Sequence, residues 1–185
     1  MKDPTARISI VTGDITRQRV DAIVNAANSS LLGGGGVDGA IHHAAGPELL
    51  EQCRTLHGCA TGAAKITHAY RLQAKWIIHT VGPVWQGGEY QEAELLTSCY
   101  RNSLQLAQQH HAVTVAFPSI STGAFRYPIE LACRIAIREI MAFLETHDLP
   151  EQVRIVCFDR HTHGRYARAL TEYLASTTNP PHETT

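Results

Sequence analysis

Apolar and polar positions divide the chain into short apolar runs that alternate with longer segments of helical periodicity. The short runs end at glycine, proline or polar residues, which is typical of buried strands. We expect strands at residues 7–11, 22–25, 65–70, 76–81, 113–117 and 153–158.

The longer segments carry apolar residues three and four positions apart, which predicts amphipathic helices. Pro47 and Pro128 suit the first turns of two of them. We expect helices at residues 37–45, 48–57, 93–109, 128–144 and 165–174. Strands that alternate with helices predict a layered α/β domain with a largely parallel sheet, which binds ligands at the carboxyl ends of its strands.

Length and composition fit one domain. The chain has 185 residues, of which we assign 1–175 to the domain. Residues 176–185 are polar and proline-rich, which predicts a disordered tail. No apolar run is long enough to span a bilayer, the first residues lack a secretory signal, and the five cysteines form no C-x-x-C pair. We therefore expect a cytoplasmic protein with reduced thiols.

The net charge of −1 argues against a dedicated nucleic-acid binder, and we expect no direct nucleic-acid or membrane partner. This net charge is compatible with an anionic small-molecule ligand, since backbone amides bind phosphate without lysine.

One candidate site follows the second predicted strand. The four glycines at 33–36 remove every side chain from a loop that leads into a helix, so that N–H groups can point at an anion. Asp38 and His42 lie four residues apart on one face of that helix. Asn25 and Asn28 precede the loop. A flexible linker with Asp38 as a first-turn residue is the alternative interpretation.

A second candidate site, residues 119–128, joins an apolar strand to a helix that begins with proline, and its serine, threonine and glycine residues offer donors to phosphate. An ordinary helix entry is the alternative, but two such loops together suggest a diphosphate. Two weaker signals are Asp14, which could accept from an amino group such as that of adenine, and Phe158, which could stack on a base.

Several common cofactor and catalytic signatures are absent from the sequence. The histidine pairs lack the second ligand cluster of a zinc site. No G-K-[ST] follows the glycines, so there is no Walker loop, and there is no G-x-S-x-G elbow. We expect neither a metal nor a cofactor.

Together these motifs resemble the MacroD-type group of macrodomains, which includes bacterial O-acetyl-ADP-ribose deacetylases. The resemblance runs from about residue 7 to residue 174. It is carried by residues 13–16 (Gly-Asp-Ile-Thr), 20–28 (Val-Asp-Ala-Ile-Val-Asn-Ala-Ala-Asn), 33–42 (Gly-Gly-Gly-Gly-Val-Asp-Gly-Ala-Ile-His) and 118–125 (Pro-Ser-Ile-Ser-Thr-Gly-Ala-Phe). It implies a three-layer α/β/α fold around a mixed, mostly parallel six-stranded sheet, with ADP-ribose in a cleft on its crest.

The resemblance also implies a role for each matched position. Asp14 would hold the adenine amino group with Ile15 beside it, and Phe158 would pack on the adenine. The residues around the distal ribose would be Asn25, Asn28, Asp38 and His42. The diphosphate and ribose loops would be formed by Gly35, Gly36 and Val37, and by Ser121, Thr122, Gly123, Ala124 and Phe125. At His43 many relatives carry arginine, and at Arg126 often glycine, so Arg126 either adds a cation near the ligand or points to solvent.

The expected reaction is hydrolysis of an ester at the distal ribose, on O-acetyl-ADP-ribose and on ADP-ribosyl groups of aspartate or glutamate side chains. Asp38 would orient or deprotonate water, Asn25 would fix the ribose hydroxyls, and His42 would position Asp38 or the ribose. The alternatives are a non-catalytic reader of ADP-ribose or ADP-ribosylated proteins, and a phosphatase of ADP-ribose 1″-phosphate. A third, suggested by one branch of relatives, is a regulator of an RNA-processing enzyme, which the near-neutral charge does not support.

Overall fold

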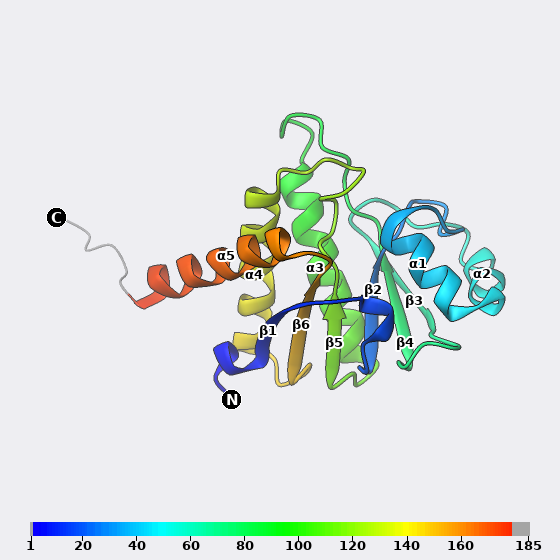
Figure 1. Cartoon of the computed structure of the whole chain (residues 1–185), viewed down its shortest axis with the longest axis horizontal. Coiled ribbons are helices and arrows are strands. Elements are labelled where there is room, and N and C mark those ends of the chain that lie inside the picture. The colour runs from blue at the N-terminus through cyan, green and yellow to red at the C-terminus, as the bar shows by residue number, and fades with distance from the viewer. Residues whose placement is uncertain (1, 179–185) are drawn as a thin grey trace.

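A six-stranded sheet forms the centre of the molecule (Figure 1). The structure is a computed structural model and describes residues 2–178. The strands are β1 (Ile8–Thr12), β2 (Ala22–Ala26), β3 (Ala64–His68), β4 (Trp76–Thr80), β5 (Thr114–Phe117) and β6 (Gln152–Cys157). The helices are α1 (Gly36–Ala45), α2 (Pro47–Arg54), α3 (Glu92–Gln109), α4 (Ile129–Thr146) and α5 (Arg160–Thr178), with short 3₁₀ helices η1 (Pro4–Arg7) and η2 (Ile15–Arg17).

The strands lie in the order β1-β6-β5-β2-β4-β3. Every neighbouring pair is parallel except β3 and β4, which a short turn joins in antiparallel order. The expected mixed, mostly parallel sheet is therefore confirmed.

Helices cover both faces of this sheet and form the outer layers of an α/β/α sandwich. One hydrophobic cluster joins the sheet to α3, α4 and α5, and the other joins it to α1 and α2. Figure 1 shows these two groups of helices on different sides of the strands. The three-layer arrangement that the resemblance implied is thus present.

Alternation along β2 and β4 decides which side chains face α1. Val24 belongs to the cluster with α3 and α4, whereas Ile23 belongs to the cluster with α1 and α2. Asn25 lies two residues after Ile23, so it faces α1 as well. His79 is the register partner of Asn25 on β4 and points to the same side. Two polar side chains are therefore buried beneath α1, near the carboxyl ends of their strands.

The ends of α5 differ from the prediction. The helix begins at Arg160 rather than at 165, because an Asp159 carboxylate oxygen accepts from Thr162 N at 2.7 Å and caps the first turn. It also continues to Thr178, three residues into the segment that we assigned to the tail. The Ser176 and Thr178 hydroxyls donate to helix carbonyls one turn earlier, which satisfies them within the helix. Residues 179–185 of the predicted tail lie outside the described residues.

Other boundaries shift by smaller amounts. Helix α2 ends at Arg54 rather than at 57, since His57 adopts a positive φ of 55° that is incompatible with a right-handed helix. The predicted strand at 7–11 begins at Ile8 instead, because Arg7 ends η1 and sends its side chain under α4.

Arg7 closes the end of α4. Its buried guanidinium donates to the carbonyl oxygens of Leu144, His147, Asp148 and Pro150 at 2.6–3.0 Å. These acceptors include a carbonyl of the last helical turn, which has no partner within the helix. The interaction ties the N-terminal segment to the connection that leads into β6. Among residues 2–178, no helix combines the length and the apolar character needed to cross a membrane.

Candidate active site

A cavity of about 530 Å³ opens where β2, β5 and β6 end, a volume in the range of small-molecule sites. Its lining includes these residues of the two predicted loops and the adenine position: Asn28, Gly35, Gly36, Val37, Asp38, Ser121, Thr122, Gly123, Ala124, Phe125 and Phe158. The remaining lining residues are Ala26, Ala27, Gly34, Gly82, Ser119, Val156, Asp159 and Thr162. The structure thus brings both predicted loops to one cavity.

The first loop delivers the N-terminus of α1 to the cavity. Gly36 has φ +56°, a conformation that glycine adopts without strain, and it lets the chain turn into the helix. Gly39 packs its backbone against the Gly34 carbonyl oxygen so closely that any side chain at 39 would overlap it. Asn28 shapes the same loop, because its Nδ2 donates to Gly33 O at 2.7 Å and its Oδ1 accepts from Ser30. The Asn28 amide is therefore engaged within the loop.

The second loop presents a strained and unpartnered serine. Ser121 has φ +65°, which is uncommon for a residue with a side chain. Its buried Oγ has no hydrogen-bond partner among the described residues. Gly82, which follows β4, lies so close to Ser121 that a Cβ there would overlap the hydroxyl. The loop thus holds one buried hydroxyl ready for a ligand.

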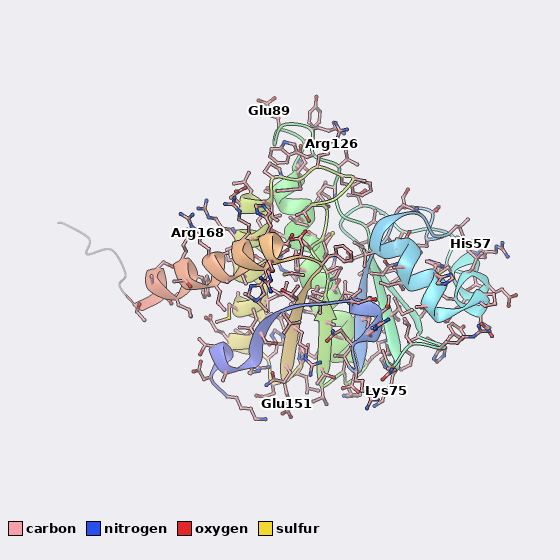
Figure 2. All side chains as sticks on the ribbon, viewed as in Figure 1. His57, Lys75, Glu89, Arg126, Glu151 and Arg168 are labelled. Carbon is pink, nitrogen blue, oxygen red and sulfur yellow. The ribbon has the colours of Figure 1, made fainter. Side chains whose placement is uncertain are left out.

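Helix α5 is hydrogen-bonded to this loop through Tyr166. The buried Tyr166 hydroxyl donates to Ser119 Oγ at 2.9 Å, and Ser119 Oγ lies 2.6 Å from Thr122 Oγ1. Burial raises the pKa of Tyr166 well above its ordinary value, so the hydroxyl keeps its proton and remains a donor. Farther along, Phe125 O accepts from Trp85 N at 2.8 Å. Arg126 is exposed, does not line the cavity and lies at the outer end of the molecule (Figure 2).

Asp38 is the buried carboxylate of the cavity and lies in the first turn of α1, where the helix dipole favours a negative charge. Its Oδ1 accepts from Asn25 Nδ2 at 2.8 Å. His42 Nε2 lies 3.6 Å from the same oxygen, which is longer than a hydrogen bond. Oδ2 accepts no hydrogen bond from residues 2–178, so it is the oxygen that a water or a ligand hydroxyl can reach.

Asn25 and His42 do not line the cavity, but both lie next to Asp38, which does line it. Asn25 donates a hydrogen bond to Asp38, and His42 approaches the same carboxylate oxygen. Asn25 Oδ1 and His42 Nε2 are buried without a partner among the described residues. A buried polar atom without a partner is costly, and a bound molecule is one means of satisfying it. Their assigned roles stay predictions.

At the predicted adenine end, one residue lines the cavity and two lie outside it. Phe158 is 89% exposed and lines the cavity, so its ring is free to stack on a base. Asp14 does not line the cavity, and its Oδ1 accepts from Thr16 N and Thr16 Oγ1, contacts that lower the pKa of Asp14. Ile15 is buried in the core. A bond from Gly13 N to Cys157 O nevertheless sets Asp14 beside the end of β6.

His79, Gly82 and Thr162 were not predicted as site residues. The signal for His79 was a histidine inside the apolar run 76–81, which ordinarily indicates a core position. Its ring lies 3.1 Å from Asn25 Nδ2 through Nδ1 and 2.9 Å from Thr67 Oγ1 through Nε2. Burial, with a smaller contribution from nearby His42, lowers the pKa of His79 to about 3, so the ring is neutral.

The thiols are poorly suited to catalysis. All five cysteines are free and buried, as expected of reduced thiols. Burial, and then the charge of Asp38, raises the pKa of Cys53 to about 11, which disfavours the nucleophilic thiolate at neutral pH. Among residues 2–178, no three histidine, cysteine or acidic side chains are grouped so that they could hold a metal ion.

Comparisons with known proteins extend these observations. The family model described as Macro domain matches residues 24–136. A macro domain-containing protein of Methanosarcina mazei is 59% identical over 168 residues, which cover 91% of this chain and 90% of that protein. A Salmonella newport protein named O-acetyl-ADP-ribose deacetylase is 56% identical over 172 residues, or 91% of this chain and 96% of the relative.

Solved structures agree with the sequence relatives. The Oceanobacillus iheyensis macrodomain with ADP has a TM-score of 0.87 and 45% identity, with 92% of each chain covered. The Trypanosoma brucei macrodomain in complex with ADP-ribose has a TM-score of 0.83 and 41% identity, over 89% of this chain and 69% of that chain. The resemblance drawn from the motifs is confirmed, and the chain belongs to the macro domain family.

Proposed function

We propose that this protein binds ADP-ribose in the cavity and hydrolyses esters of its distal ribose, with O-acetyl-ADP-ribose as a substrate. The single observation that carries the proposal is the buried Asp38 carboxylate. One of its oxygens is anchored by Asn25 and the other is free, at the edge of a cavity between two anion-suited loops. A protein that only binds the nucleotide needs the two loops but not an anchored carboxylate.

The two loops would hold the diphosphate. The backbone amides of residues 34–36 and the start of α1 form one side, and the Ser121 loop forms the other. Phe158 would stack on the adenine at the β6 end of the cavity, with Asp14 at the neighbouring strand end accepting from the adenine amino group. A ligand held this way directs its distal ribose towards Asp38.

In the hydrolytic step, Asp38 Oδ2 would orient a water molecule and take its proton as the water oxygen attacks the ester carbonyl carbon. The bond between that carbon and the ribose oxygen then breaks. The ribose oxygen takes up the proton that Asp38 had accepted, which restores the carboxylate, and acetic acid is released, so that one ester and one water give one acid and one alcohol. Asn25 Oδ1 would accept from a ribose hydroxyl and fix the sugar.

The names of close relatives support this substrate class. Relatives from Salmonella, at 55–56% identity, carry the name O-acetyl-ADP-ribose deacetylase. The same chemistry would serve ADP-ribosyl esters of aspartate and glutamate side chains, because both are carboxylic esters of the distal ribose.

The test is acetate release from O-acetyl-ADP-ribose at a large excess of substrate over protein. Repeated turnover is the expected result. Binding without turnover would indicate a reader, and faster turnover of ADP-ribose 1″-phosphate than of the acetyl ester would indicate a phosphatase. Either result would contradict the proposal.

A further inference from the structure

A chain of buried polar side chains runs from the sheet to the cavity. It begins at Thr67 on β3, passes through His79 on β4 and Asn25 on β2, and ends at Asp38 on α1. Successive contacts measure 2.9, 3.1 and 2.8 Å, and all four side chains are buried. Polar groups so buried are held in place by their mutual hydrogen bonds.

The hydrogen bonds of Thr67 determine the tautomer of His79. Thr67 Oγ1 lies 3.0 Å from His68 O, to which only its hydroxyl hydrogen can be donated. With that hydrogen donated to His68 O, the same oxygen accepts from His79 Nε2, which then carries the ring hydrogen. The opposite tautomer would set a hydrogen on Nδ1 against the Asn25 Nδ2 donor, so the contact at Nδ1 supports the same assignment. Because the neutral ring carries only one hydrogen, Nδ1 is then bare, that is, unprotonated, and it is an acceptor that faces Asn25 Nδ2.

The bare Nδ1 in turn determines the orientation of the Asn25 amide. The two hydrogens of Asn25 Nδ2 are donated to Asp38 Oδ1 and to His79 Nδ1, two acceptors on one side of the amide. A flipped amide would place Oδ1 against both of them, which is repulsive. In the observed orientation Oδ1 remains buried and unpartnered among the described residues, as the acceptor that the proposed function assigns to a ribose hydroxyl.

We propose that His79 is a positioning residue of this site, which fixes the Asn25 amide through its bare Nδ1 while Thr67 holds the hydrogen on Nε2. The expected effect on the reaction rate rests on the proposed ester hydrolysis, whereas the tautomer of His79 is independent of it. Among residues 2–178, the only other hydrogen-bonding group near Nε2 is the Cys53 thiol at 3.9 Å, which is a weak partner. Cation formation is opposed by burial and by His42, as the lowered pKa of His79 reflects.

The tautomer is measured directly by long-range ¹H–¹⁵N correlation on protein labelled with ¹⁵N-histidine, between pH 5 and 8. The His79 signals are identified as those missing in His79→Asn. We expect a protonated Nε2 and a bare Nδ1 throughout. A hydrogen on Nδ1, or a titration near pH 6.5, would overturn the proposal without any reference to substrate.

The kinetic test uses two substitutions at one position. In asparagine, Oδ1 occupies the place of histidine Nδ1, so His79→Asn retains the acceptor for Asn25. His79→Leu has a similar size but offers no acceptor. We expect kcat to fall by about 10- to 100-fold in His79→Leu with KM within about threefold, since misorientation of a positioning group affects the reaction more than binding. His79→Asn should restore most of kcat. Equal loss in both, or wild-type kcat in folded His79→Leu, contradicts the proposal.

A matched threonine pair covers the case in which His79→Leu does not fold. Thr67→Val removes the acceptor that holds the hydrogen on Nε2, so it should yield a mixture of tautomers and a lower kcat. Thr80→Val removes a hydroxyl that is equally buried but donates to Ala63 O, outside the chain. It should leave tautomer and kcat unchanged. Identical behaviour of the two variants would overturn the proposal, whereas absence of turnover in the wild type would instead reject the proposed function.

Discussion

Asn25 and His79 are register partners on β2 and β4, and Asn25 Nδ2 lies 3.1 Å from His79 Nδ1 and 2.8 Å from Asp38 Oδ1. The position of the Asp38 carboxylate at the start of α1 is thus set by hydrogen bonds to the interior of the sheet as well as by the helix itself. Together with Thr67 on β3, which contacts His79, residues from three strands and one helix set the geometry at one end of the cavity.

The neutral His79 predicts a specific dependence of stability on pH. Its folded pKa of about 3 lies below its ordinary value of 6.5, so below pH 6.5 the unfolded chain binds a proton that the folded protein does not. The stability is therefore fully present above pH 6.5 and falls on acidification, by about 1.4 kcal/mol per pH unit.

Urea denaturation at pH 7 and pH 5 measures this dependence against His79→Asn, which has no titrating group at the position. Between these pH values the wild type should lose about 2 kcal/mol more unfolding free energy than the variant. Parallel losses would show that His79 titrates in the folded protein much as it does in the unfolded chain.

Asp38→Asn tests the carboxylate with the least change of shape. The amide can still accept from Asn25 Nδ2 through its oxygen, so the loop and the cavity should persist. Acetate release should fall by about 100-fold or more, as is typical when a general base is removed, while the Kd for ADP-ribose changes much less. Asp148→Asn, on the exposed surface, serves as the control. Undiminished turnover in Asp38→Asn would remove the carboxylate from the reaction.

Two helical glycines should respond to alanine in opposite directions. In a helix, Gly→Ala ordinarily stabilises by up to about 1 kcal/mol. Gly164 in α5 has open space at its Cβ position, so Gly164→Ala should raise the unfolding free energy. At Gly39 a Cβ would overlap the backbone oxygen of Gly34, so Gly39→Ala should lower both stability and turnover. Denaturant titrations of both variants decide this, and a stabilised Gly39→Ala with wild-type turnover would contradict the account of the loop.

Arg7 should contribute to stability without contributing to activity. Arg7→Met leaves four buried or half-buried carbonyl groups without their charged donor, which should cost about 3 kcal/mol or more. Arg168 lies on the outer surface of α5 (Figure 2). Arg168→Met removes its ion pair with Glu172, and exposed pairs of this kind contribute little to stability. Comparison of the two variants by urea denaturation should show a large loss only for Arg7→Met, with kcat unchanged in both at a temperature where they remain folded.

The sequence predicted the strands and the two loops because the signals for both are local. Apolar runs punctuated by glycine and proline mark strands, and residues 33–38 show a glycine loop ahead of a helix in consecutive positions. The sequence did not predict which side chains meet across the sheet. His79 approaches Asn25 through a parallel pairing of strands that are more than fifty residues apart, and nothing near either residue specifies that register.

Side-chain interactions with the backbone were also missed. Helix α5 begins at Arg160 because the Asp159 side chain caps it, whereas the predicted helix began at residue 165, directly after Gly164. Glu92 is a similar case. Its buried carboxylate accepts from the backbone N–H groups of Gln86, Gly88 and Tyr90 and shapes the loop before α3. By its position it reads as an ordinary acidic residue of the first helical turn.

Calorimetric titration with ADP-ribose and with adenosine monophosphate tests the central claim most directly, namely that the two loops hold a diphosphate and place the distal ribose beside Asp38. The monophosphate retains the adenine and one phosphate but lacks the second phosphate and the distal ribose. Micromolar binding of ADP-ribose, with the monophosphate weaker by about tenfold or more, is the predicted result. Equal affinities for the two ligands, or no binding of ADP-ribose, would contradict the account.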